Sequence, residues 1–233
     1  MTVTNAVETT MIWGTVSGAS MVGMVISLLL SVVLPIFLGI FIYKKTKAWV
    51  PAFFIGCGIF VGFAMILEQI CHAIVLTVTG SAIRDNIWLY AIYGGLAAAL
   101  FEECGRWIAM KFCLMYGAGH GGIEAFLILG MSSMSNLLTA AMINGGLMEK
   151  TMTALEPAQQ EVTYHQLSVL WTTPAYQFYL APVERISAIA LQIALSILVY
   201  SAVKTGRKLQ LAAAFGLHFA VDFLTVVCAS TIP

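Results

Sequence analysis

The segment 99–112, ALFEECGRWIAMKF, places ionisable side chains in an otherwise apolar stretch. On a helix, Arg106 would share a face with Glu102, four residues away, and with Glu103, three residues away. Arg106 can therefore neutralise one carboxylate and leave the other for chemistry. A carboxylate withdrawn from water is a useful general base for activating a water molecule. The spacing leaves open which of the two glutamates has that role.

Two further pairs of polar residues have the same helical spacing. His120 and Glu124 are four residues apart, and so are His218 and Asp222. Histidine can donate a hydrogen bond to a developing oxyanion, or it can bind zinc. The metalloprotease motif HExxH is absent, so spacing alone does not define a metal site. We expect three helices to turn these groups toward one site.

The elements that must position these residues are membrane helices. The chain is 60% hydrophobic and 9% charged, whereas a soluble domain has roughly 45–50% apolar and about 25% charged residues. The composition predicts one integral membrane domain over 1–233, an all-α polytopic transmembrane helical bundle of about six to seven spans. Net charge is zero, which gives no indication of a nucleic-acid partner. Five scattered cysteines without a CxxC pair indicate neither a disulfide framework nor a thiolate zinc site.

Six stretches are long and apolar enough to cross a bilayer. They are 19–43, 50–78, 87–112, 118–143, 181–203 and 208–230. Basic residues favour the cytoplasmic side. Lys44, Lys45 and Lys47 follow the first stretch, Lys111 lies at the end of the third, and Lys204, Arg207 and Lys208 separate the last two. Both termini are then external, and so is the polar connection 144–179, which we expect to be partly helical.

Depth along the helices separates the buried charges into two predicted groups, at about 1.5 Å per residue. The inner group, in the cytoplasmic half, comprises Glu102, Glu103, His120, Glu124 and His218. The outer group comprises Glu68, His72, Glu184 and Arg185. In the outer group, we expect Glu68 or Glu184 to pair with Arg185.

Glycines inside the spans indicate close helix packing. Small residues four apart, such as Gly58 and Gly62, let membrane helices approach one another. The run GAGHGG at 117–122 could serve the same purpose, or leave room for a substrate backbone.

Four ordered blocks resemble a known family. FEECGR (101–106), GAGHGGIEA (117–125), ERISAI (184–189) and GLHFAVD (216–222) are similar to the YhfC-type membrane peptidases. That family is grouped with the CAAX prenyl endopeptidases, the PrsW-type site-1 proteases and the gamma-secretase scaffold subunit. The resemblance runs from about residue 50 to the C-terminus.

The resemblance implies roles for these residues. Glu102 would be the base for water, with Glu103 as its neighbour, Arg106 as orienter and His120 as assistant, while His218 and Asp222 would stabilise the oxyanion. Glu124 joins this candidate set through its spacing from His120. A zinc ion, if one is used, would be held by Glu103, His120 and His218. The family pattern favours a histidine near Gln192, and the glutamine there favours a metal-free mechanism.

Four functions remain open at this stage. The leading one is a glutamic-type intramembrane endopeptidase, and a zinc-dependent version is the second. A non-catalytic membrane scaffold and a proton-coupled transporter are the others, although the sequence shows no inverted repeat of the kind that transporters contain. The expected partners are the lipid bilayer and a membrane-embedded or membrane-proximal polypeptide substrate, in the bacterial plasma membrane.

Overall fold

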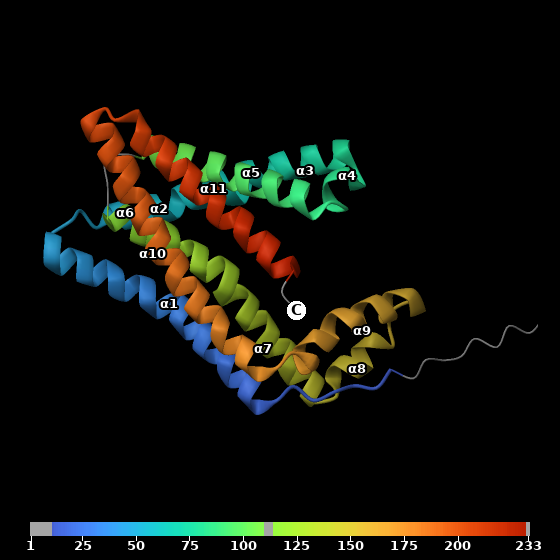
Figure 1. Cartoon of the computed structure of the whole chain (residues 1–233). Helices are drawn as coiled ribbons and strands as arrows, with labels where there is room; N and C mark the ends of the chain where they lie inside the picture. The colour runs from blue at the N-terminus through green and yellow to red at the C-terminus, as the bar shows by residue number, and fades with distance from the viewer. Residues whose placement is uncertain (1–10, 110–113, 232–233) are drawn as a thin grey trace, which may run out of the picture. The chain divides into compact units, whose positions relative to one another are not determined.

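The computed structural model describes residues 11–109 and 114–231, and in these ranges the chain forms helices and no strands (Figure 1). The elements are α1 (Gly18–Thr46), α2 (Pro51–Phe60), the π-helix η1 (Val61–Glu68), α3 (Gln69–Thr79), α4 (Ser81–Arg84), α5 (Ile87–Ile108), α6 (Leu114–Ala125), the π-helix η2 (Phe126–Gly130), α7 (Met131–Asn144), α8 (Leu147–Met152), α9 (Pro157–Thr172), α10 (Ala175–Thr205) and α11 (Lys208–Thr231).

Six of these helical stretches are long and apolar enough to cross a membrane, which confirms the all-α polytopic prediction. They are Gly18–Thr46, Pro51–Thr79, Ile87–Ile108, Leu114–Asn144, Ala175–Thr205 and Lys208–Ser230. The fourth begins four residues before the predicted start, and the fifth begins six residues before. The polar connection is partly helical as predicted, because it contains α8 and α9. Its external placement, like the orientation of the termini, stays a prediction, and Lys111 and Cys113 lie outside the described residues.

The helix ends follow local sequence signals. Pro51 occupies the first turn of α2, where its missing N–H costs nothing. The Asn86 side chain caps α5 by accepting from the backbone nitrogens of Trp88 at 3.0 Å and Leu89 at 3.2 Å. Gly206 has φ of +70° in the tight turn between α10 and α11, a conformation that favours glycine.

The described residues divide into two compact units. The first unit contains 11–30 and 129–183, and the second contains 31–128 and 184–231, apart from the four residues at 110–113. The prediction of a single domain stays a prediction. In the first unit, the apolar core consists of Val16, Met24, Ala140, Ile143 and Leu170.

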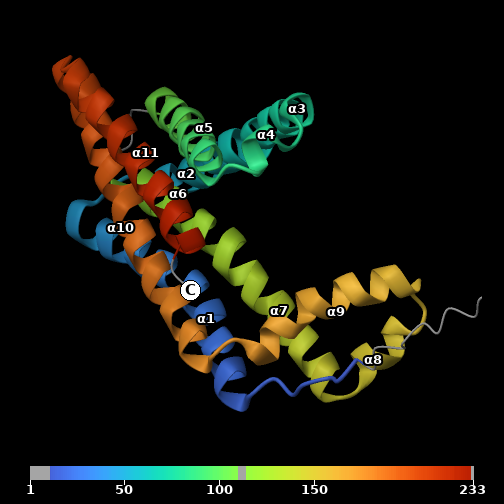
Figure 2. The ribbon, with the colours of Figure 1, turned by 45° about the vertical axis from the view of Figure 1, so that its right-hand side comes forward.

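The second unit brings together helices that are distant in sequence. In it, α5 runs beside α11, and α2 packs on α6 (Figures 1 and 2). A Cβ atom on Gly56 would clash with the Tyr116 carbonyl oxygen, and one on Gly119 would clash with that of Phe53. The backbones of α2 and α6 therefore touch, as small residues allow.

The predicted packing role of Gly58 and Gly62 is wrong, since neither would bring a Cβ within 4 Å of another described group. The buried face of α2 consists of Ala52, Gly56 and Phe60, which are four residues apart. Gly58 is two residues from Gly56, so it lies on the opposite side of the helix. Other parts of the protein occupy the space beside the glycines at 117–122. The neighbouring residues are Pro35, Phe53 and, from α10, Ile189, Gln192, Ile193 and Ser196. They leave no room there for a substrate backbone.

Candidate active site

The second unit contains a buried cluster of charges at the end of α5. Glu102, Glu103 and Arg106 are all buried, and Arg106 has no exposed surface. Adjacent residues on a helix point about 100° apart, so the two glutamates face different neighbours. Each carboxylate therefore has a different nearest partner, which is His120 for Glu102 and His218 for Glu103.

Arg106 binds Glu103. Its Nε donates to the two Glu103 oxygens at 3.0 and 3.2 Å, whereas its Nη2 lies 4.0 Å from Glu102 Oε2. The rest of the guanidinium is fixed by α10, because Nη1 donates to the Gln192 carbonyl oxygen at 3.0 Å and to Ser196 Oγ at 2.6 Å. Nη2 also donates to the Gln192 side chain. A buried charge needs this degree of pairing to be tolerated.

His120 of α6 binds the other glutamate. Its Nε2 lies 2.8 Å from Glu102 Oε2, and its Nδ1 lies 3.2 Å from the Tyr116 hydroxyl. The ring has no exposed surface and stands edge-on to Phe60, with centroids 5.2 Å apart. These contacts fix the plane of the imidazole and direct Nε2 at Glu102.

His218 of α11 connects both carboxylates. Its Nδ1 lies 2.7 Å from Glu103 Oε1, and its Nε2 lies 3.7 Å from Glu102 Oε2 and 3.4 Å from Asp222 Oδ2. The Glu103 carboxylate therefore orients the ring by accepting from Nδ1, as carboxylates do behind catalytic and metal-binding histidines.

Gln192 of α10 is a residue of this cluster that sequence reasoning did not include among the candidates. Its Nε2 donates to Glu102 Oε2 at 3.0 Å and to Glu124 Oε2 at 2.7 Å, so one amide group joins the two carboxylates. The available signal was a buried amide in the apolar stretch ALQIALS, with Ser196 four residues later on the same face.

Arg185 does not belong to a separate outer group, contrary to the depth argument. Its Nη1 lies 3.1 Å from Glu124 Oε1, and it also pairs with Glu184 as predicted. The depth argument failed because α6 begins at Leu114 and thus takes Glu124 ten residues into its span. In addition, α10 has 31 residues, about 46 Å, which exceeds the bilayer core of about 30 Å, so counting residues from one end does not fix the depth of Arg185.

Glu68 and His72 lie in contact with each other. His72 Nε2 is 3.2 Å from Glu68 Oε1, and His72 Nδ1 is 2.7 Å from the Tyr93 hydroxyl. The described partners of Arg185 do not include Glu68. This pair stands apart from the hydrogen bonds of the buried cluster.

A cavity of about 360 Å³ opens beside the cluster. Glu102, Glu124, Gln192, His218 and Asp222 contribute to its lining. Four of the seven sequence candidates thus line one cavity. The other three lie behind the lining, where Glu103 contacts His218, Arg106 contacts Glu103, and His120 contacts Glu102. The lining combines the carboxylates of Glu102, Glu124 and Asp222 with the imidazole of His218.

Three ligand atoms in the cluster are close enough to consider a metal ion. One donor atom each from Glu102, His120 and Glu124 lies within 4.8 Å of the other two. Two oxygens and one imidazole nitrogen suit zinc, and catalytic zinc sites use three protein ligands. The set predicted from sequence, with Glu103 and His218, shares His120 with this one and stays a prediction.

Comparisons with known proteins identify the family of the chain. Residues 30–232 match the YhfC intramembrane metalloprotease family, and the chain belongs to that family. It is 40% identical to the uncharacterized membrane protein YhfC of Bacillus subtilis (strain 168), over 87% of this chain and 83% of that protein. No solved structure matches the chain.

Proposed function

We propose that this protein is an intramembrane endopeptidase that hydrolyses a peptide bond in or near the bilayer at the cavity formed by α5, α6, α10 and α11. The observation that carries the proposal is the contact of Glu102 with His120 at 2.8 Å, with Glu124 joined to Glu102 through Gln192. Membership of an intramembrane metalloprotease family supports the same reaction.

Each residue of the cluster has a separate role in the proposed hydrolysis. His218 and Asp222 line the cavity and are 3.4 Å apart, so a protonated His218 Nε2 can donate to the oxyanion of the tetrahedral intermediate. Glu103 holds that ring in place through Nδ1, and Arg106 offsets the charge of Glu103. Glu102 and His120 face the position of the attacking water.

The zinc-dependent form of this reaction is supported by the donor set and by the family. Glu102, His120 and Glu124 would hold the ion, and the hydrogen bond between His120 Nδ1 and Tyr116 leaves Nε2 directed at the site. Zinc, when bound, would polarise the scissile carbonyl and acidify water.

A metal-free glutamic mechanism is the second candidate, and Gln192 is the observation that favours it. Its amide already lies between the two carboxylates and compensates their charge with hydrogen bonds. In this form Glu102 takes the proton of the attacking water, and His120 orients Glu102 by its contact at 2.8 Å.

Metal analysis of the purified full chain tests the two forms. We expect one zinc per chain by mass spectrometry, loss of peptide cleavage on dialysis against a chelator, and recovery on adding zinc. The His120→Ala variant should lose the bound zinc, whereas His165→Ala, on the exposed part of α9, should keep it. Cleavage that persists in a metal-free protein would reject the zinc form and leave the glutamic one.

Cleavage itself is tested with fluorogenic transmembrane peptides in lipid nanodiscs. Hydrolysis by the isolated chain would support the proposal and exclude a scaffold without activity. If a broad panel of such peptides were left intact by a folded, zinc-loaded protein, the endopeptidase function would have to be abandoned.

A further inference from the structure

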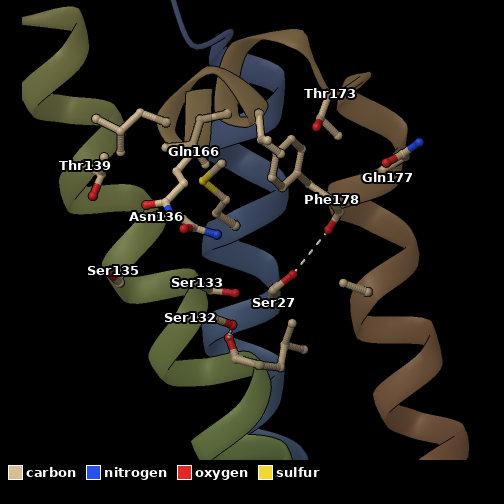
Figure 3. Close-up of a pocket in the computed structure, with 16 residues that line it drawn as sticks. Ser27, Ser132, Ser133, Ser135, Asn136, Thr139, Gln166, Thr173, Gln177 and Phe178 are labelled. Atoms are coloured by element: carbon tan, nitrogen blue, oxygen red, sulfur yellow. Dashed lines mark hydrogen bonds between the residues drawn. The ribbon is translucent and has the colours of Figure 1, made fainter. Parts of the chain in front are cut away.

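The first unit contains a second cavity, which is polar but uncharged. Its volume is about 710 Å³, and its walls come from α1, α7, α9 and the start of α10 (Figure 3). None of its sixteen lining residues is acidic, basic or histidine. Its hydrogen-bonding residues are Ser27, Ser132, Ser133, Ser135, Asn136, Thr139, Gln166, Thr173 and Gln177.

Helix α7 supplies most of these polar groups from within a predicted membrane span. The stretch MSSMSNLLT at 131–139 contributes Asn136 and Thr139, which are three residues apart and share a face. Asn136 lies eight residues before Asn144, the last residue of the span, so about 12 Å along the helix. A carboxamide at that depth is unfavourable in hydrocarbon unless water or another polar group meets it.

The cavity retains unused hydrogen-bonding capacity. Ser27 is satisfied, because its single O–H can donate to the carbonyl oxygen of Gly23 at 2.9 Å or to that of Phe178 at 3.2 Å. By contrast, no described protein group forms a hydrogen bond with the carboxamide of Asn136 or Gln166. In Figure 3 these two side chains reach toward the same space from α7 and α9.

The lining selects the chemistry of a ligand. A carboxamide offers one acceptor and two donors, which match the N–H and C=O of a peptide group. The absence of charged side chains from the lining disfavours ions, and the apolar groups of Met24, Leu170 and Phe178 suit a partly apolar chain. The volume falls in the range of small-molecule pockets, about 300–1,000 Å³, which corresponds to a few residues.

We propose that this cavity binds a short, unwound and uncharged stretch of polypeptide through its backbone amides. That the polypeptide is a substrate rests on the endopeptidase function proposed above. The cavity would then recognise substrates whose membrane segment contains residues that leave the helical conformation easily, such as glycine and serine, because only an unwound stretch exposes its peptide groups.

Binding is measured on the full chain in nanodiscs, with Glu102→Gln in the background so that no peptide is cleaved. The probe is a fluorescein-labelled peptide, blocked at both ends, with a central glycine–serine stretch between leucine flanks. The comparison peptide has leucine and alanine in the centre. By fluorescence anisotropy, the glycine–serine peptide should bind at least about tenfold more tightly, the equivalent of about 1.4 kcal/mol.

Two substitutions remove the unused carboxamides with little change in volume. Asn136→Leu and Gln166→Leu should each weaken binding of the glycine–serine peptide about tenfold. The matched control is Gln159→Leu, two turns earlier on the same helix, which is exposed as Gln166 is but lies outside the cavity lining. If a leucine variant does not fold, Thr139→Val removes a lining hydroxyl at nearly constant size and should weaken binding in the same direction.

The outcomes separate this site from the active site. Equal binding of both peptides, or equal affinity of all folded variants, would overturn the proposal. It would also fall if a neutral galactolipid bound in a way that depended on Asn136 and Gln166 while the peptide did not. The chain with Glu102 intact could cleave no peptide while the glycine–serine peptide still bound with the expected variant effects. The cavity would then stand as a polypeptide site, and the endopeptidase function would fail.

Discussion

The buried cluster of the second unit and the polar cavity of the first unit differ in how their polar side chains are hydrogen-bonded within the protein. In the cluster, the Arg106 side chain by itself forms hydrogen bonds with three residues, Glu103, Gln192 and Ser196. In the cavity, the carboxamides of Asn136 and Gln166 have no partner among the described residues. Charges withdrawn from water must be paired within the fold, whereas uncharged amides can remain open to water or a ligand at a smaller cost in free energy. The first arrangement suits catalysis on fixed groups, and the second suits recognition.

The largest expected effect concerns chemistry. Glu102→Gln should lower the rate of peptide-bond hydrolysis by about 10²–10⁴-fold, because a neutral amide cannot accept the proton of water or hold a metal ion as a carboxylate does. The rate is measured with a fluorogenic transmembrane peptide in nanodiscs. Glu149→Gln, on the exposed part of α8, is the control. An unchanged rate in Glu102→Gln would remove the cluster from catalysis.

Stability should separate the two regions next. Arg106→Met leaves Glu103 buried without its main counter-charge and should reduce the free energy of unfolding by about 3–5 kcal/mol. Asn136→Leu breaks no hydrogen bond to protein and should change it by less than about 1 kcal/mol. Unfolding in mixed detergent micelles gives both values, with Arg207→Met, in the exposed turn after α10, as a control for loss of charge. Similar losses at Arg106 and Asn136 would contradict the comparison.

The same amide chemistry should have a different role in the cluster. Gln192→Leu removes the link between Glu102 and Glu124 and should lower activity or zinc affinity about 10–100-fold, as loss of a group that hydrogen-bonds to metal-binding residues does. Isothermal titration with zinc and the cleavage assay measure these two quantities. Gln159→Leu, outside both sites, should leave both unchanged. A Gln192→Leu protein with full activity and full zinc affinity would show that the link is only structural.

The smallest effect concerns the packing that supports the cluster. Gly56→Ala places a methyl group against the Tyr116 backbone and should destabilise the protein by about 1–3 kcal/mol. Gly58→Ala, on the same helix, meets no described group within 4 Å and should change stability by no more than about 0.5 kcal/mol. Detergent unfolding compares the pair. A larger loss for Gly58→Ala would mean that α2 uses its other face for packing.

The residues of the candidate site could be selected from the sequence because a charged side chain in a membrane span costs free energy. An ionisable side chain inside a span is unfavourable unless it is paired or hydrated, so each one indicates a function or a partner. Those that the sequence shows here are Glu102, Glu103, Arg106, His120 and His218. Helical spacing then gives the pairs within a helix. Contacts between helices had to be inferred from depth, and that inference misplaced Arg185. Gln192 was not selected because an uncharged amide gives a weaker signal.

The sequence by itself determined the six spans, the residues of the candidate site and the family. Length and apolar composition are sufficient for a membrane helix, since it satisfies its own backbone. Tertiary structure alone decided that Arg106 pairs with Glu103 and leaves Glu102 to His120, because Arg106 is within helical reach of both. It also decided that Gly56 rather than Gly58 packs, and that Asn136 and Gln166 face one cavity. These choices depend on which helix faces meet, and that is a property of the whole fold.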